Sequence, residues 1–274
     1  MNIFTFDFAR MALYATVLIS LTCGLLSPVV VLKQRSYLGD TLSHLVFPGV
    51  VLGILCAQFT HIPQWGCVIL GAAATALIGT LISEWILKKL QCPPDSAAIV
   101  CLTTFFALGV VLISSQKGIR ISPDSIFFGD VLTLNKIDLT VIFIAFILVL
   151  LAIFLLKKHW DAWLVDTEFA EIAGFKVKLL NGLFPVLLTI SVLSGLFAVG
   201  GLMISALITI PTLLYAPRSV FSPVVVLLSV CMGLVGLALA FVFNWPVGPT
   251  IVLVGFVTLI LKIGTLHVRQ HLRN

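Results

Sequence analysis

Residues 137–156 read IDLTVIFIAFILVLLAIFLL, a run in which Asp138 is the only charged side chain. A helix of this length rises about 30 Å, which matches the hydrocarbon core of a bilayer. Backbone polar groups inside lipid must be satisfied within the protein, and a helix satisfies them within its own segment. The alternation of apolar and polar residues that marks a barrel strand is absent. The run therefore predicts a membrane-spanning helix.

Apolar segments of similar character recur along the rest of the chain. The segment at 202–215 is short for a full span, so we expect eight or nine spans. The predicted fold is an all-α, polytopic membrane helix bundle that forms one transmembrane domain over residues 1–274. The other expected segments are 11–33, 44–60, 64–87, 96–114, 182–199, 202–215, 222–243 and 248–264.

Composition agrees with a membrane protein and excludes a soluble domain. Hydrophobic residues make up 60% of the chain and charged residues 10%, with a mean hydropathy of +1.20, against roughly half and a quarter in soluble domains. The net charge of +5 does not indicate nucleic-acid binding, because the Lys and Arg side chains lie in the gaps between apolar segments, where they set orientation. Their pattern fits nine crossings with a cytoplasmic C-terminus, although 115–136 must then lie outside despite its basic residues.

Two polar stretches interrupt the apolar segments, an extracytoplasmic loop at about 115–136 and a cytoplasmic one at about 157–181. In the second, Asp166 and the two residues after it predict a helix start, and Gly174 predicts the helix end. Phe169 lies on that short helix as an apolar anchor. Such a helix either docks into a groove of a partner protein or serves as an interfacial linker.

Asp40 and His44 are the ionisable pair that stands out near an apolar segment. Their i, i+4 spacing places them on one helix face, and a carboxylate with an imidazole suits divalent manganese, zinc or iron. Two ligands make a weak site, but a twofold dimer would double them. The alternative is that Asp40 caps the helix and His44 satisfies a backbone carbonyl.

Other chemical signals are weak or missing. His267 and His271 are also spaced i, i+4, but they lie in a basic polar tail, where we expect a solvated helix face. The sequence holds no G-x-x-x-x-G-K-[ST] phosphate-binding loop, no H-E-x-x-H and no G-x-S-x-G. We therefore expect no enzyme activity in this chain, and ATP hydrolysis, if it powers transport, must come from another chain.

Several blocks resemble, in order, the permease subunit of bacterial metal-importing ABC transporters of the zinc/manganese/iron type. The first is GDTLSHLVFPGVVLG at 39–53. A later one, DTEFAEIAGFKV at 166–177, is similar to the family's cytoplasmic coupling loop. The remaining blocks are TTFFALGVVLIS at 103–114, IFFGDVL at 126–132, GGLMISALITIPTLLYA at 200–216 and PVGPTIVL at 246–253.

The resemblance implies a dimeric, usually homodimeric, helical core in the bacterial inner membrane, surrounded by lipid. It implies Asp40 and His44 as pathway residues and an ATPase docked at 166–177, with Glu171 and Gly174 at the motif positions. An extracytoplasmic solute-binding protein would deliver the metal. No permanent cofactor is implied, only the divalent metal in transit.

Two other functions compete with this interpretation. A secondary metal transporter driven by an ion gradient would need no ATPase, and the amphipathic 157–181 stretch argues against it. An intramembrane enzyme at Asp40 and His44 would lack a third metal ligand and a general base.

Overall fold

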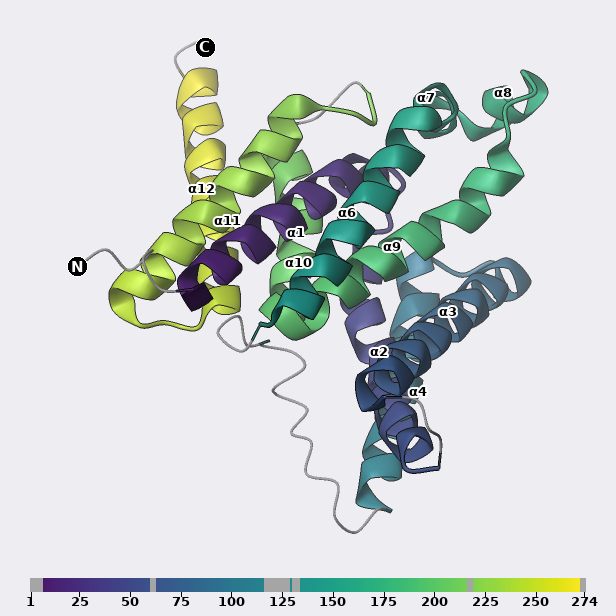
Figure 1. The fold of residues 1–274 in the computed structure, drawn as a ribbon. Helices are drawn as coiled ribbons and strands as arrows, with labels where there is room; N and C mark the ends of the chain where they lie inside the picture. Colours follow the sequence, from purple (N-terminus) through teal and green to yellow (C-terminus); the bar gives the residue numbers. More distant parts are fainter. Residues whose placement is uncertain (1–6, 60–62, 116–128, 130–133, 216–218, 272–274) are drawn as a thin grey trace.

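The computed structural model describes residues 7–59, 63–115, 129, 134–215 and 219–271 (Figure 1). Within these ranges the regular secondary structure is entirely helical, which confirms the predicted all-α class. The helices are α1 (Asp7–Leu32), α2 (Tyr37–Ala57), α3 (Gln64–Leu90), α4 (Pro94–Ser114), α6 (Lys136–Leu155), α7 (Lys157–Val165), α8 (Thr167–Ile172), α9 (Val177–Val199), α10 (Gly201–Leu214), α11 (Pro223–Phe243) and α12 (Val247–His271).

Eight of these helices are long and apolar enough to cross a membrane, and α10 is a shorter apolar helix of 14 residues. At about 1.5 Å per residue, α10 is only about 21 Å long. The predicted count of eight or nine is therefore confirmed, with α10 as the segment that separates the two numbers.

Helix α6, which contains most of the apolar run 137–156, begins at a capping box. The Asn135 side chain accepts hydrogen bonds from the backbone N–H groups of Ile137 (2.7 Å) and Asp138 (3.1 Å). In return, Asp138 Oδ2 accepts from the Asn135 N–H at 3.0 Å. These bonds satisfy N–H groups that the first helical turn leaves without intrahelical partners. The single acid of the apolar run thus starts the helix.

The helices form two groups joined by α9 and by the contact of α10 with α2. Helices α2, α3 and α4 pack together, whereas α1, α10, α11 and α12 form the other group, with α6 beside α1 (Figure 1). The α2–α3 contact is close because glycines meet there. A Cβ on Gly49 would lie 2.2 Å from the Gly71 carbonyl oxygen, a distance no side chain tolerates. Small residues allow this approach in lipid, where packing drives helix association.

The long apolar run around residue 200 is broken into α9 and α10 at Gly200, whose φ of +83° favours glycine. Gly129 lies against this break, because a Cβ there would be 2.4 Å from Gly200 N. Gly129 is the one described residue between 116 and 133. The remainder of the predicted 115–136 loop, including most of the 126–132 block, lies outside the described residues.

After this break, α10 carries the chain back toward α7. The Asp161 carboxylate of α7 accepts hydrogen bonds from Ser219 Oγ at 2.9 Å and from the Val220 N–H at 2.6 Å. Residues 219 and 220 follow α10, so its C-terminal end and the start of α11 lie at the end of the bundle that holds α7.

Candidate functional site

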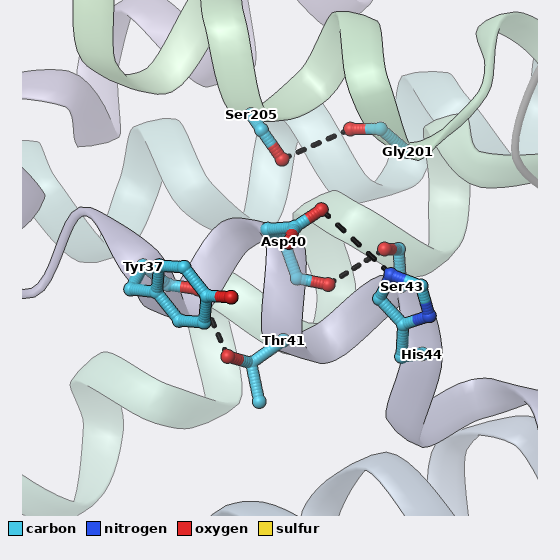
Figure 2. A network of polar contacts seen from close by, with 7 residues as sticks. All are labelled: Tyr37, Asp40, Thr41, Ser43, His44, Gly201 and Ser205. Carbon is cyan, nitrogen blue, oxygen red and sulfur yellow. Dashed lines mark hydrogen bonds and ion pairs between the residues drawn. The ribbon is translucent and has the colours of Figure 1, made fainter. Parts of the chain in front are cut away.

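Asp40 and His44 lie in the first two turns of α2, on one face. Asp40 Oδ1 is 3.9 Å from His44 Nε2 (Figure 2), and the two side chains remain 34% and 22% exposed. The predicted juxtaposition is confirmed. The capping interpretation of Asp40 is wrong, because Ser36 occupies the N-cap position and Asp40 is inside the helix.

The helix starts at Tyr37, before the apolar segment predicted at 44–60, and the polar residues of its first turns bond within it. Thr41 Oγ1 donates to the Tyr37 carbonyl at 2.9 Å, and Ser43 Oγ donates to the Asp40 carbonyl at 2.6 Å. Such bonds let hydroxyl side chains lie in an apolar bundle without unsatisfied polar atoms. Low hydropathy at 37–43 therefore conceals a continuous helix.

Helix α10 packs directly against this part of α2. Ser43 faces Gly201, where a Cβ would lie 2.6 Å from Ser43 Cβ, and Gly39 faces Ser205 at 3.6 Å from Cβ to Cα. The residue order shows that the two helices are antiparallel. Ser205 Oγ donates to the Gly201 carbonyl at 3.0 Å and so bonds within α10 (Figure 2). Gly201, the first residue of α10, therefore lies beside Ser43, which precedes His44 in the chain.

Aromatic side chains from α2 and α4 support the imidazole. The rings of His44 and Phe106 meet edge to face, with centroids 5.4 Å apart and planes at 86°. Phe106 in turn stacks on Phe47 at 5.5 Å, and Gly109 of α4 leaves room for Phe47, since a Cβ there would lie 2.3 Å from its ring. Phe106 thus packs against the His44 ring, while Asp40 lies near the Nε2 atom of the same ring.

Asp40 and His44 are the two candidate metal donors at this locus among the described residues. Among the described residues, no group of three or more His, Cys, Asp or Glu side chains lies close enough to hold a metal ion. Two donors do not complete the coordination of any first-row divalent metal in proteins, which takes four to six ligands. The geometry thus offers a partial site, with both ligands on one helix face.

The predicted short helix in the 157–181 stretch is present as α8. Asp166 Oδ1 accepts from the N–H groups of Glu168 (2.9 Å) and Phe169 (3.1 Å), which is the N-cap that the sequence predicted. The helix ends before Gly174, whose φ is +79°. A Cβ on Gly174 would meet nothing within 4 Å, so backbone conformation, not space, favours glycine there.

Helix α8 exposes two large apolar side chains among its acidic ones. Phe169 is 63% exposed and Ile172 is 87% exposed, whereas Ala170 is buried against the bundle. Glu171 and Gly174 are exposed beside them. Exposed apolar side chains on one short helix are typical of a protein contact surface.

Sequence reasoning missed the contacts around residues 33–36. Glu84 of α3 binds Arg35 at 2.7 Å. Contacts between residues so distant in sequence leave no local pattern. His267 and His271 lie on α12, and their side chains are outside the described part of the chain.

Comparison with known proteins adds the family. The sequence profile of the ABC 3 transport family matches residues 5–265. The manganese transport system membrane protein MntC of Halalkalibacterium halodurans is 27% identical over 257 residues, covering 92% of this chain and 85% of that protein. The manganese import system permease protein ScaB of Streptococcus gordonii is 29% identical over 254 residues, covering 90% and 87%.

The fold has a solved counterpart. The structure of PsaBC from Streptococcus pneumoniae in complex with Fab superposes with a TM-score of 0.78 at 26% sequence identity, covering 94% of this chain and 91% of that chain. The membrane fold, the ordered spans and these relatives agree with one another. The chain therefore belongs to the ABC 3 transport family and is a membrane permease of the metal-transporting ABC type.

Proposed function

We propose that this chain forms the membrane pathway of an ATP-driven importer of a divalent transition metal, with manganese as the first cargo to test and zinc and ferrous iron as the others. The observation that carries the proposal is the pairing of Asp40 and His44, 3.9 Å apart on α2. The names of the relatives, which describe manganese transport, support the choice of cargo.

Asp40 and His44 serve as transit ligands in this proposal. A carboxylate oxygen and an imidazole nitrogen match the donors that Mn²⁺, Zn²⁺ and Fe²⁺ accept. Two donors from one chain hold a metal weakly, which suits an ion that must leave again. A second copy of the chain, related by a twofold axis, supplies two more donors, so we propose a homodimer with the metal passing between the copies.

The motor of the importer is proposed to be a separate ABC ATPase. The sequence itself holds no phosphate-binding loop. The exposed apolar face of α8, with Phe169 and Ile172, has the character of a helix that docks into a groove. Glu171 and Gly174 border that face and complete the proposed contact.

Orientation follows from the same assignment. The end of the bundle that holds α7 and α8 faces the cytoplasm, together with the C-terminus, in the inner membrane of a bacterium. An extracytoplasmic solute-binding protein delivers the metal at the opposite end. The chain binds no permanent cofactor in this scheme and performs no chemistry of its own.

The test is uptake of radioactive manganese by cells that carry Asp40→Ala together with His44→Ala. We expect uptake to fall to the level of cells without the permease, while the amount of protein in the membrane stays unchanged. Asp95→Ala is the matched control, because Asp95 is an exposed carboxylate in the first turn of α4, and it should transport normally. Normal uptake by the double variant would show that these residues are not in the pathway.

Energy source and cargo are tested in membrane vesicles. Uptake should require ATP and the ATPase chain, and should persist when a protonophore collapses the ion gradient. Uptake without ATP that the protonophore abolishes would instead establish a secondary transporter. Single-metal assays with Mn²⁺, Zn²⁺ and Fe²⁺ rank the cargo.

A further inference from the structure

The connection between α1 and α2 is a tight elbow of four residues, 33–36. The Arg35 N–H donates to the Val30 carbonyl at 2.9 Å and the Gln34 N–H donates to the Val31 carbonyl at 3.0 Å. Gln34 adopts a left-handed φ of +55°, as helix ends of this type require. The elbow is therefore bonded to the helix before it, and α2 begins directly after it.

Lys33, in this elbow, reaches the junction of α7 and α8. Its ammonium donates to the Trp163 carbonyl at 2.5 Å and to Thr167 Oγ1 at 2.8 Å. The same nitrogen lies 4.3 Å from the centroid of the Trp163 ring, within the range of a cation–π contact. Trp163 belongs to α7 and Thr167 opens α8, so one ammonium holds both helices.

The α7–α8 junction is firmly attached at its other side. Trp163 is buried, with its ring 5.5 Å from that of Trp160 and 6.0 Å from that of Phe184 on α9. The Trp163 carbonyl therefore belongs to a packed junction of α7 and α9 from which α8 begins. The Lys33 ammonium joins this junction to the elbow.

A cavity of about 810 Å³ lies beside the elbow, lined by residues of α3, α8 and α9 as well as by Lys33 and Arg35. Beside this cavity, two hydrogen bonds and a cation–π contact join Lys33 to the α7–α8 junction. At the wall of the same cavity, Arg35 binds Glu84 of α3 at 2.7 Å, so the elbow is attached to the α2–α4 group as well.

We propose that Lys33 is a positioning residue that transmits movement of α8 to α2 and so to Asp40, which follows the elbow by four residues. This inference rests on the proposed function, because an ATPase must move α8 and a metal must use α2. Lys33 itself contacts neither the metal nor the ATPase in this scheme. Lys33 determines how much of the movement that the ATPase produces in α8 reaches Asp40 on α2.

The test compares Lys33→Met with wild type in proteoliposomes that contain the permease and its ATPase. Two quantities are measured, Mn²⁺ transported and ATP hydrolysed. We expect Lys33→Met to bind the ATPase and hydrolyse ATP normally, while Mn²⁺ transported per ATP falls by about twofold to thirtyfold, the range seen when one residue of a coupling network is changed. Lys33→Arg keeps the donors and the cation and should recover most of the ratio.

Two further variants separate transmission from general damage. Thr167→Val removes one acceptor of the ammonium with nearly the same volume and should lower the ratio in the same direction. Lys88→Met removes a cation from the wall of the same cavity and should leave the ratio unchanged. An unaltered ratio in Lys33→Met, or a loss of ATPase binding that accounts for the whole defect, overturns the inference.

The outcomes also distinguish this inference from the proposed function. If the wild-type complex neither binds an ATPase nor moves Mn²⁺, the proposed function fails and the inference fails with it. If the wild-type complex transports Mn²⁺ and Lys33→Met transports equally well per ATP, only the role of Lys33 is wrong.

Discussion

Lys33 is a charged residue whose surroundings change its chemistry. Its ammonium is drawn out of water between the end of α1 and the α7–α8 junction, and this desolvation lowers its pKa below the ordinary lysine value, while the nearby Asp166 carboxylate opposes the change. Deprotonation would remove the charge that strengthens the hydrogen bonds to the Trp163 carbonyl and Thr167 and would end the cation–π contact with the Trp163 ring. The contact is therefore sensitive to alkaline pH.

The lowered pKa predicts a titration at Trp163. As pH rises through the lowered value, in the window below about 10.4, the cation over the indole ring is lost and tryptophan emission should change. Lys33→Arg should show no such step, because arginine stays protonated. The difference in emission between wild type and Trp163→Phe isolates this ring from the other tryptophans, and superimposable profiles for wild type and Lys33→Arg would contradict the prediction.

The sign of the stability effect separates this titration from unfolding. A folded-state pKa below the unfolded value means that the folded state binds fewer protons in that window. The contribution of Lys33 to the free energy of unfolding therefore rises with pH there, while the ammonium contact is lost. An emission change with no loss of helix signal is the expected combination.

Residue-level chemistry was partly predictable. The i, i+4 spacing sufficed to place Asp40 beside His44, because a helix repeats at that interval whatever surrounds it. The edge-to-face contact of His44 with Phe106 and the contact of Ser43 with Gly201 were not predictable, since they depend on which helices become neighbours.

At the scale of single helices, the glycine contact between α2 and α3 fixes how closely the pathway helix is held. We expect Gly49→Ala to lower the free energy of unfolding by about 1–3 kcal/mol, because its Cβ would lie 2.2 Å from the Gly71 carbonyl oxygen and overpacking costs that much. Thermal unfolding in detergent measures the effect.

Gly182→Ala provides the matched control for Gly49→Ala. It lies inside α9, and a Cβ there meets nothing within 4 Å. The gain in helix propensity, up to about 1 kcal/mol, should leave this variant as stable as wild type or more stable. Equal destabilisation of both variants would show that close approach is not what the glycine provides.

Helix α8 carries its own prediction. Phe169→Ala combined with Ile172→Ala should abolish co-purification of the ATPase without lowering thermal stability, because both side chains are exposed and support no core packing. Phe154→Ala is the control, since Phe154 is an apolar residue of α6 that is 67% exposed. Retained co-purification by the α8 double variant would place the ATPase contact elsewhere.

Helix boundaries show what hydropathy alone predicts. The Asp166 cap and the Gly174 end of α8 were correct because local side chain–backbone bonds decide them. The apolar segment predicted at 44–60 covers only part of α2, which starts at Tyr37, because hydroxyls bonded to carbonyls within the helix lower hydropathy without ending the helix.

At the scale of the whole molecule, the arrangement of two helix groups could not be read from the sequence. The apolar spans predict that the chain forms a helix bundle. Because every span in lipid is similarly apolar, hydropathy does not indicate which helices become neighbours. Close contacts such as Gly49 with Gly71, and polar contacts such as Arg35 with Glu84, make that choice. They join helices, and no periodic pattern marks them in advance.

The two-donor site makes a prediction about assembly. A chain that offers one carboxylate and one imidazole holds a divalent metal firmly only with donors from a second copy, so we expect one Mn²⁺ bound per two chains in the purified permease. Metal analysis after equilibrium dialysis, with protein counted by amino-acid analysis, measures this ratio. Asp40→Ala with His44→Ala should bind none.

Mixed dimers test the sharing of donors between copies. Separately tagged wild-type and double-variant chains, expressed together and purified through both tags, contain one intact pair of ligands. If the copies share the metal, this mixed dimer should bind Mn²⁺ much more weakly than the wild-type dimer, because half of the donors are gone. If it instead binds one metal with wild-type affinity, each chain holds its own ion, and the site must draw further ligands from the same copy.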